Sequence, residues 1–166
     1  MGQPFHITFE TPFGFMRPVS DGRFLTRLDW NQAGFAEADN PDDVSRETMA
    51  QLEAYLAGRQ KIFNLPMRPE GKSPAARHWL GVMSRIPYGV VVTYAQFAAS
   101  AGKPNAPRAA GTACASNPIP IIYPCHRVVR AGGALGNYGG GSELNPKHPE
   151  NLGRKQALID LERRFA

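Results

Sequence analysis

Cys125 and His126 are the neighbouring residues best suited to chemistry, and they follow Pro124 at the end of the apolar run "IPIIY". A nearby imidazole can lower the pKa of a thiol and produce the thiolate, which is the form of cysteine that attacks. An unreactive role stays open, because a free cysteine is more often a small buried hydrophobic residue than a catalyst. The pair therefore indicates either a reactive sulfur or an inert one.

Three further residues bear on that choice. Cys114 lies in an Ala-rich segment with no His or Lys beside it, so we interpret it as structural. Asn117 precedes a proline and forms either a plain turn or a hinge that ties the cysteine loop to the segment before it. Glu162 is either solvated or reaches a histidine and holds the tautomer that a base requires.

Arg108 opens the segment "RAAGTACAS", which is predicted to be a helix of small residues. The helix dipole opposes a cation at a helix N-terminus by up to about 1 kcal/mol, so this guanidinium is expected to have another task. One such task is to fill the space left when a base rotates out of duplex DNA. The alternative for Arg108 is an ordinary solvated side chain. The alternative for the helix is that its small residues pack inside the protein.

The first half of the chain is predicted to be α/β. "FHITFETPFGFM" and "RFLTRLDW" alternate apolar and polar side chains around the turn "SDG", which is typical of antiparallel strands. A helix is expected with Asn40 as N-cap, Pro41 at its first position and Gly58 as its end. "KIFNLPM" predicts one more short strand.

The second half is predicted to be mostly helical. Ser73 caps a helix that Pro74 begins, and another helix starts after Thr93 and stops at Gly102. Together with "RAAGTACAS" the latter makes a candidate helix-turn-helix. The apolar stripe of the first helix is formed by Ala76, Trp79, Leu80, Met83 and Ile86. The buried face of the last predicted helix, "LGRKQALIDLERRF", is formed by Leu158, Leu161 and Phe165.

Charge divides the chain at the linker-like stretch "RPEGKSP", where we place a domain boundary near residue 70. Residues 1–70 hold 7 Lys/Arg and 10 Asp/Glu, whereas residues 71–166 hold 12 and 4, within a net charge of +5. The basic second half is expected either to meet a polyanion or to be a merely soluble basic face.

Composition narrows the class of protein. Two cysteines are too few for a disulfide framework or a thiolate zinc site, and they suit a reducing compartment. The sequence "MGQPFHITFE" is typical of neither a signal peptide nor a myristoylation site. No apolar run approaches the ~18 residues of a membrane helix. We therefore expect a soluble, cytoplasmic protein.

Several motifs occur together in a familiar order. "PCHRV" at 124–128 is preceded by "IPYGVVVTY" and "RAAGTACASNPIPIIY" and followed by "GALGNYGGG". This constellation resembles the O6-alkylguanine-DNA alkyltransferases, also called methylated-DNA–protein-cysteine methyltransferases. The resemblance is specific from about residue 73 to 141. It is looser in the first half, where it depends on "AYLAGRQKIFNLP".

The resemblance implies a two-domain fold. Residues 1–70 would form a small ribonuclease H-like α/β domain, with an antiparallel sheet and a helix. Residues 71–166 would form a helical, winged-helix-like DNA-binding domain that carries the alkyl-acceptor site. Its helix-turn-helix is implied to enter the minor groove, which the Ala-rich surface suits.

The resemblance also implies a role for each catalytic residue. Cys125 would accept the alkyl group, and His126 would act as its base through a bridging water. Glu162 would orient the imidazole, Asn117 would be the hinge, and Tyr94 would donate a proton or hydrogen bond to the leaving guanine.

A second set of residues is implied to hold DNA and the flipped base. The DNA contacts would come from Arg108 as an arginine finger, Ala109, Thr112 and Ala113. The base pocket would be lined by Cys114, Pro120, Val128, Tyr138 and Gly139.

The expected function is single, irreversible transfer of the alkyl group from O6-methylguanine to Cys125, with O4-methylthymine as a second candidate substrate. The protein is expected to act as a monomer on double-stranded DNA, with no cofactor and no metal. An alkyltransferase-like protein that only marks lesions is the main alternative, but such proteins carry tryptophan at the cysteine position. A cysteine hydrolase is a second alternative, and it would leave the basic helix-turn-helix unexplained.

The sequence departs from the family pattern in three places. "SELNPKHPEN", at 142–151, separates the glycines from the last helix, where relatives continue almost directly. Within it Lys147 and His148 either touch phosphate or belong to a solvated loop. Tyr123 replaces a common aliphatic residue, and Gly139 replaces the serine of some members and so offers only a backbone donor.

Overall fold

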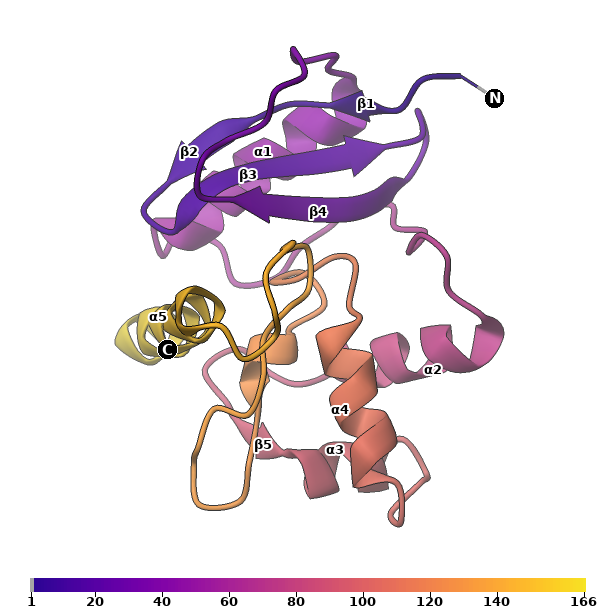
Figure 1. The fold of residues 1–166 in the computed structure, drawn as a ribbon, viewed down its shortest axis with the longest axis vertical. Helices are drawn as coiled ribbons and strands as arrows, with labels where there is room; N and C mark the ends of the chain where they lie inside the picture. The colour runs from indigo at the N-terminus through magenta and orange to yellow at the C-terminus, as the bar shows by residue number, and fades with distance from the viewer. Residues whose placement is uncertain (1) are drawn as a thin grey trace.

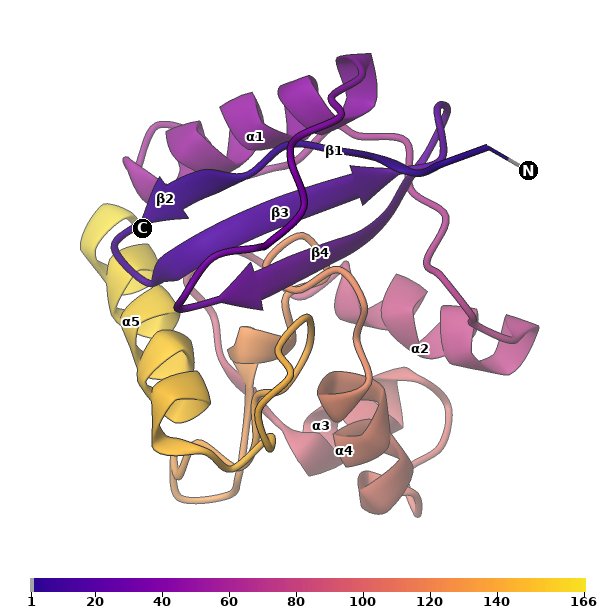
Figure 2. The same ribbon diagram turned by 45° about the horizontal axis from the view of Figure 1, so that its top comes forward.

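The computed structural model describes residues 2–166, and its N-terminal part is an antiparallel sheet with one long helix against it (Figure 1). The central strand β3 pairs with β1, β2 and β4, always antiparallel. Figure 2 shows α1 lying across one face of this sheet. These elements are β1 (Phe5–His6), β2 (Phe9–Thr11), β3 (Gly14–Ser20), β4 (Leu25–Asn31) and α1 (Asp43–Leu56). The predicted antiparallel sheet with a helix is confirmed.

Helix α1 begins later than the sequence suggested, because Asp42 and not Asn40 is its N-cap. The Asp42 carboxylate accepts from the backbone N–H of Ser45 at 2.8 Å, and the Ser45 hydroxyl accepts from the N–H of Asp42 at 2.9 Å. Asn40 is instead bound to His6 by two backbone hydrogen bonds, of 2.9 and 3.0 Å. The predicted cap at Asn40, with Pro41 as first helical residue, is therefore wrong.

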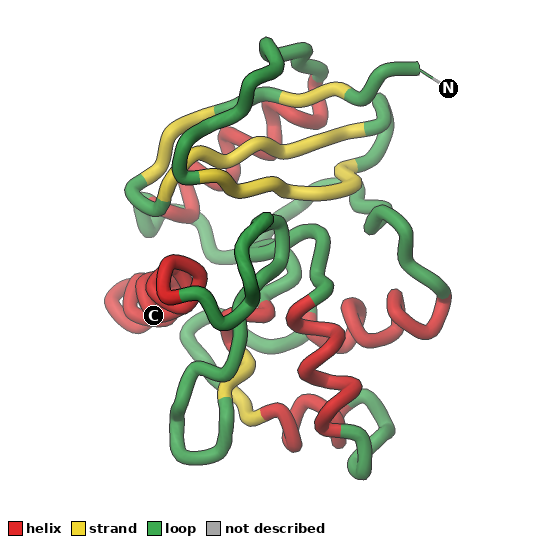
Figure 3. Tube along the Cα trace, viewed as in Figure 1, coloured by secondary structure: helices red, strands yellow, loops and turns green. Residues whose placement is uncertain are grey.

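The predicted strand "KIFNLPM" is also wrong. Residues 61–67 form no strand, apart from an isolated bridge between Leu25 and Met67. The bridge uses the carbonyl of Pro66, which accepts from the N–H of Leu25 at 2.7 Å. Proline has no N–H to donate, so the ladder cannot continue through Pro66 and Pro69. A loop thus joins α1 to α2 (Figure 3).

The second half is mostly helical, as predicted. Its elements are α2 (Pro74–Met83), β5 (Val92–Thr93), α3 (Tyr94–Ser100), α4 (Pro107–Ala115), the 3₁₀ turn Cys125–Arg127, β6 (Val128–Val129) and α5 (Pro149–Phe165). Ser73 caps α2, Thr93 caps α3, and Gly102 follows α3 with a φ of 77°. A tight turn joins α3 to α4, and the two helices pack against each other. The start signals at Ser73 and Thr93 and the stop signal at Gly102 are therefore confirmed, whereas α2 ends at Met83, so Ile86 is buried beyond the helix on whose stripe it was predicted.

Helix α5 differs from its prediction at its start and in its buried face, although it ends at Phe165 as predicted. It starts three residues earlier, because the His148 ring accepts a hydrogen bond from the N–H of Glu150 at 3.1 Å. Leu158 and Leu161 are buried as predicted, whereas Phe165 is 38% exposed. The last turn extends beyond the core, and the Phe165 ring instead lies over the turn at Gly58. The prediction of a buried Phe165 is wrong.

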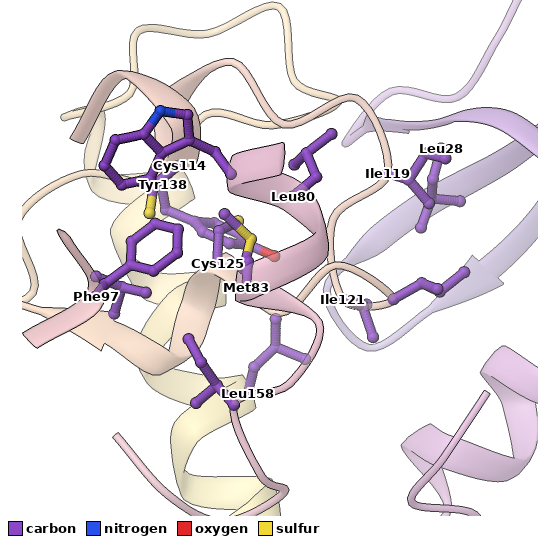
Figure 4. Close-up of a cluster of buried hydrophobic side chains, with 14 of the residues drawn as sticks. Leu28, Leu80, Met83, Phe97, Cys114, Ile119, Ile121, Cys125, Tyr138 and Leu158 are labelled. Carbon is purple, nitrogen blue, oxygen red and sulfur yellow. The ribbon is translucent and has the colours of Figure 1, made fainter. Parts of the chain in front are cut away.

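One hydrophobic cluster joins the sheet to the helices and includes Leu28, Met83, Ile119, Cys125 and Leu158 (Figure 4). The outer strand β4 also holds two loops of the second half by its backbone. The N–H of Leu28 donates to Pro118 and that of Trp30 donates to Gly141, both at 2.8 Å. These bonds fix the segments on either side of Cys125 against the sheet.

None of the helices in residues 2–166 is both long and apolar enough to cross a membrane.

Candidate active site

Cys125 opens the 3₁₀ turn and is only 1% exposed. Its Sγ accepts a hydrogen bond from Asn117 Nδ2 at 3.2 Å, and Figure 4 shows it beside Met83 in the middle of the cluster. Burial raises the pKa of the Cys125 thiol to about 11, although Asn117 and the Lys155 charge act in the opposite direction. The expected lowering of this pKa by a neighbouring histidine is therefore absent at rest, and the thiol is neutral.

Asn117 connects the end of α4 to the cysteine loop. Its Nδ2 also donates to the Tyr123 carbonyl at 2.8 Å, and its Oδ1 accepts from the N–H of Ile119 at 3.0 Å. Between these contacts Ile121 has a φ of 71°, a left-handed conformation that costs a residue with a branched Cβ roughly 1–2 kcal/mol. The buried amide thus holds a strained loop in one shape, and its role as a hinge stays a prediction.

The His126 ring reaches Glu162 on α5. Its Nε2 lies 2.6 Å from Glu162 Oε2, and because a carboxylate only accepts, Nε2 carries the proton. Nδ1 is then the basic nitrogen, and it is buried with no hydrogen-bond partner among residues 2–166. Burial lowers the pKa of His126 below 6.5 despite the opposing effect of Glu162. The imidazole is therefore neutral at pH 7.

Glu162 is the centre of a buried polar cluster. Its Oε2 accepts from His126, from the Tyr55 hydroxyl at 2.6 Å and from Arg127 Nη2 at 2.9 Å. Its Oε1 accepts from Arg127 Nε at 2.8 Å and from the N–H of Gly89 at 3.0 Å. Burial alone would raise the pKa of Glu162, but the bonds from His126 and Arg127 hold it well below its usual range. The carboxylate is thus permanently ionised.

The sequence reasoning missed two members of this cluster. Arg127 stands inside the motif "PCHRV", and a charged residue between a histidine and two valines was the available signal. Its guanidinium is 7% exposed and also donates to the Ile86 carbonyl at 2.6 Å. Tyr55 lies on α1, 107 residues from Glu162, and no local pattern points to it.

Lys155, also missed, holds the loop that follows the cysteine turn. Its Nζ is fully buried and donates to the carbonyls of Val128 at 2.6 Å, Asn137 at 3.0 Å and Leu135. Burial lowers its pKa. The signal was its spacing, because Lys155 lies three residues before Leu158 on the buried stripe of α5.

Tyr94 lies beside this loop because β5, directly before it, pairs with β6, directly after the cysteine turn. The Tyr94 hydroxyl accepts from the N–H of Asn137 at 3.3 Å, and burial raises its pKa to about 12. A Cβ added at Gly136 would lie 2.6 Å from that hydroxyl, so the close approach requires glycine.

The residues expected to line a base pocket lie around the same loops. Tyr138 is 2% exposed, and its ring contacts Trp30 of β4 edge-on at 6.3 Å. Its N–H donates to the Pro146 carbonyl at 2.8 Å, and a Cβ on Gly139 would come within 2.8 Å of Pro146 Cγ. The insertion therefore packs directly on Tyr138 and Gly139. The other expected pocket residues, Cys114, Pro120 and Val128, are all buried.

Helix α4 presents its predicted DNA-contacting side to solvent. Arg108, Ala109 and Thr112 are exposed and Ala113 is half-buried. Its N-cap, Ala106, makes no side-chain hydrogen bond, so the first N–H groups of the helix are available to a partner. An open cavity of about 360 Å³ lies beside its first turns. The lining of that cavity includes Arg108, Tyr94, Asn137, and two further cations, Arg130 and Lys147.

Comparison with known proteins places this geometry in a family. The family described as 6-O-methylguanine DNA methyltransferase, DNA binding domain, matches residues 74–164, which is more than half of the chain. A protein of Methanosarcina acetivorans named methylated-DNA–protein-cysteine methyltransferase is 36% identical over 146 residues, covering 84% of this chain and 92% of its own. A protein of the same name from Mycobacterium tuberculosis strain H37Rv is 34% identical over 160 residues, covering 94% and 90%.

Solved structures indicate the same family. The O6-methylguanine methyltransferase of M. tuberculosis superposes with a TM-score of 0.80 at 30% identity, covering 99% of this chain and 95% of its own. The M. tuberculosis protein named OGT, solved in complex with DNA, gives 0.81 at 32% identity, with 98% and 94% covered. The family match and these relatives span nearly all of the described residues, so this chain belongs to the 6-O-methylguanine DNA methyltransferase family.

Proposed function

We propose that this protein repairs DNA by transferring the alkyl group of O6-methylguanine to the sulfur of Cys125. The observation that carries the proposal is a pair of buried contacts on neighbouring residues: Asn117 donates to the Cys125 sulfur, and Glu162 holds the ring of His126, the next residue in the chain, in one tautomer. In the reaction the bond between O6 and the methyl carbon breaks and a sulfur–carbon bond forms. O4-methylthymine, which carries the same kind of O-methyl group, is a second candidate substrate.

The proton of the thiol has a defined destination. At a pKa of about 11 the Cys125 thiol does not ionise by itself near pH 7. His126 Nδ1, the free nitrogen of a neutral imidazole, accepts that proton through a bridging water as the sulfur attacks. The ionised Glu162 stabilises the resulting imidazolium.

Tyr94 serves the leaving group. Guanine departs as an anion unless it receives a proton or a hydrogen bond. With a pKa of about 12 the Tyr94 hydroxyl stays protonated and can donate to that developing charge. The product is a thioether on Cys125, which water does not cleave, so each molecule reacts once.

The target base has to leave the duplex, because Cys125 is buried. We assign the α3–α4 pair as the helix-turn-helix that enters the minor groove, where the small side chains of Ala109 and Ala113 allow a close approach. Arg108 would fill the space that the base leaves. Cys114, Pro120, Val128, Tyr138 and Gly139 would enclose the flipped base. Action as a monomer, in the cytoplasm, and the ribonuclease H-like and winged-helix-like descriptions of the two parts stay predictions, as does a boundary near residue 70.

A duplex containing O6-methylguanine with a labelled methyl group tests the proposal. We expect one label per molecule, recovered on the peptide that contains Cys125. Cys125→Ser should bind the duplex without accepting label, and no label should then appear on Cys114. Binding without transfer by the unaltered protein would contradict repair and indicate a protein that only marks lesions.

A further inference from the structure

We propose that Tyr55, on the N-terminal helix α1, is a positioning residue that tunes the His126 base through Glu162. This inference rests on the proposed function, and it adds a residue from the sheet-bearing half of the chain to the proton-transfer machinery. Tyr55 touches neither the thiol nor the imidazole.

The contact is short, buried and shared. The Tyr55 hydroxyl donates to Glu162 Oε2 at 2.6 Å, and His126 Nε2 lies at the same distance from the same oxygen. Tyr55 is 0% exposed, so solvent cannot replace the donor. Its ring is fixed by Phe63, with centroids 5.4 Å apart, and by Tyr88, at 6.1 Å and 84°.

His126 is faced by groups from several elements. Glu162, on α5, favours the protonated imidazole, whereas burial and the positive charges of Arg127, in the turn, and Lys155, on α5, disfavour it. Around Glu162, Arg127 is a permanent cation, and the Gly89 N–H is fixed by the backbone. Apart from the His126 ring itself, Tyr55 is the neutral side-chain donor on Oε2, so its removal leaves the charges of the cluster unchanged.

A donor on Oε2 competes with His126 for the negative charge of that oxygen. When Tyr55 donates, Glu162 stabilises the imidazolium less, and the imidazole stays neutral to lower pH. Without the hydroxyl, Oε2 interacts more strongly with Nε2–H and the pKa of His126 rises. Since only neutral His126 can take the thiol proton, the acidic limb of the rate profile should move to higher pH.

The test compares Tyr55→Phe with Tyr88→Phe in the full chain. Each change removes one hydroxyl from a pair of aromatic rings that pack against each other. The Tyr88 hydroxyl, however, is buried without a hydrogen-bond partner among the described residues. Single-turnover transfer from O6-methylguanine DNA is measured between pH 5 and pH 8.5. For Tyr55→Phe we expect the acidic limb about one pH unit higher, with a rate near pH 8.5 close to that of the unaltered protein. For Tyr88→Phe we expect no displacement.

A second readout does not depend on transfer. The His126 pKa is followed by NMR of the labelled ring, and it should rise in Tyr55→Phe. Replacing Tyr55 by a fluorotyrosine, whose hydroxyl is a stronger donor, should lower it and also covers the case in which Tyr55→Phe fails to fold. An unchanged His126 pKa in both, or equal displacement in Tyr88→Phe, overturns the inference. Absence of transfer by the unaltered protein contradicts the proposed function instead, because the NMR titration is unaffected.

Discussion

The cluster around Glu162 and the outer side of helix α4 use polar groups in opposite ways. At Glu162 each carboxylate oxygen has at least two donors, all of them inside the protein. On α4, Arg108 and Thr112 are exposed, and the helix N-terminus has no side-chain cap. The oxygens of Glu162 have all their donors within the protein, whereas helix α4 leaves donors free for a partner.

This difference distinguishes the residues proposed for the reaction from those proposed to bind DNA. A buried cluster in which both carboxylate oxygens of Glu162 are hydrogen-bonded holds the His126 ring in one tautomer before any substrate arrives, and this reduces reorganisation during the reaction. An exposed helix side costs the folded protein little, and in the proposed function it gains its contacts only on DNA. Changes in the first region should therefore affect folding and reaction together, and changes in the second should affect only reactions that require duplex DNA.

The largest effect is expected for Glu162→Gln. It leaves the buried Arg127 guanidinium without its charged partner, which should lower the free energy of unfolding by about 3–5 kcal/mol. Urea denaturation measures this loss, and Glu53→Gln, on the exposed side of α1, is the matched control, with an effect within about 0.5 kcal/mol. Equal free energies of unfolding in the two variants would show that the cluster around Glu162 does not stabilise the fold more than an exposed position does.

An intermediate effect is expected for Arg108→Ala. Stability should be unchanged, while repair in duplex DNA slows by about tenfold, equivalent to about 1.4 kcal/mol, because the flipped state loses its filler. Reaction with free O6-benzylguanine, which needs no flipping, should be nearly unaffected. Arg46→Ala removes the same charge from an exposed position of α1 and serves as control. Similar losses on both substrates would exclude a role in base flipping.

The smallest effect is expected on the free energy of unfolding when the pH is lowered to mildly acidic values. The folded pKa of His126 lies below 6.5, so as pH falls through 6.5 the unfolded chain binds a proton that the folded chain does not, and stability declines. The pKa of Glu162 is also lowered in the fold, so its contribution is present above 4.5 and is lost as pH falls below that value. Urea midpoints at pH 7.5 and 5.5 test the first step. His126→Gln should reduce the difference between them, and an unchanged difference would mean that other groups cause it.

The sequence allowed part of this cluster to be predicted. The family resemblance assigned Asn117, His126 and Glu162 to the cysteine site, and in the structure Asn117 bonds the Cys125 sulfur while Glu162 bonds His126. The residues alone left Glu162 as either a solvated side chain or a partner of a histidine, so its place came from the order of the family motifs. Helices α2 and α3 were predictable from local signals, since Ser73 and Thr93 cap them through residues three positions away.

The features that the sequence did not predict depend on contacts between residues that are far apart in the chain. Tyr55 meets Glu162 across 107 residues, and nothing near either residue encodes that pairing. Asn40 resembled a cap, but its pairing with His6 of β1 and the stronger capping box at Asp42 decided otherwise. The neutral Cys125 thiol could not be foreseen either, because its pKa depends mainly on how deeply the tertiary structure buries it.

The contact between Gly139 and Pro146 couples residue 139 to the loop that follows it. A Cβ at 139 would lie 2.8 Å from Pro146 Cγ, closer than Cβ atoms approach other atoms in proteins. A serine there would have to displace Pro146, whose carbonyl accepts from the N–H of Tyr138 at 2.8 Å. An engineer who wants a hydroxyl at 139 must therefore redesign the loop at 142–151 in the same step.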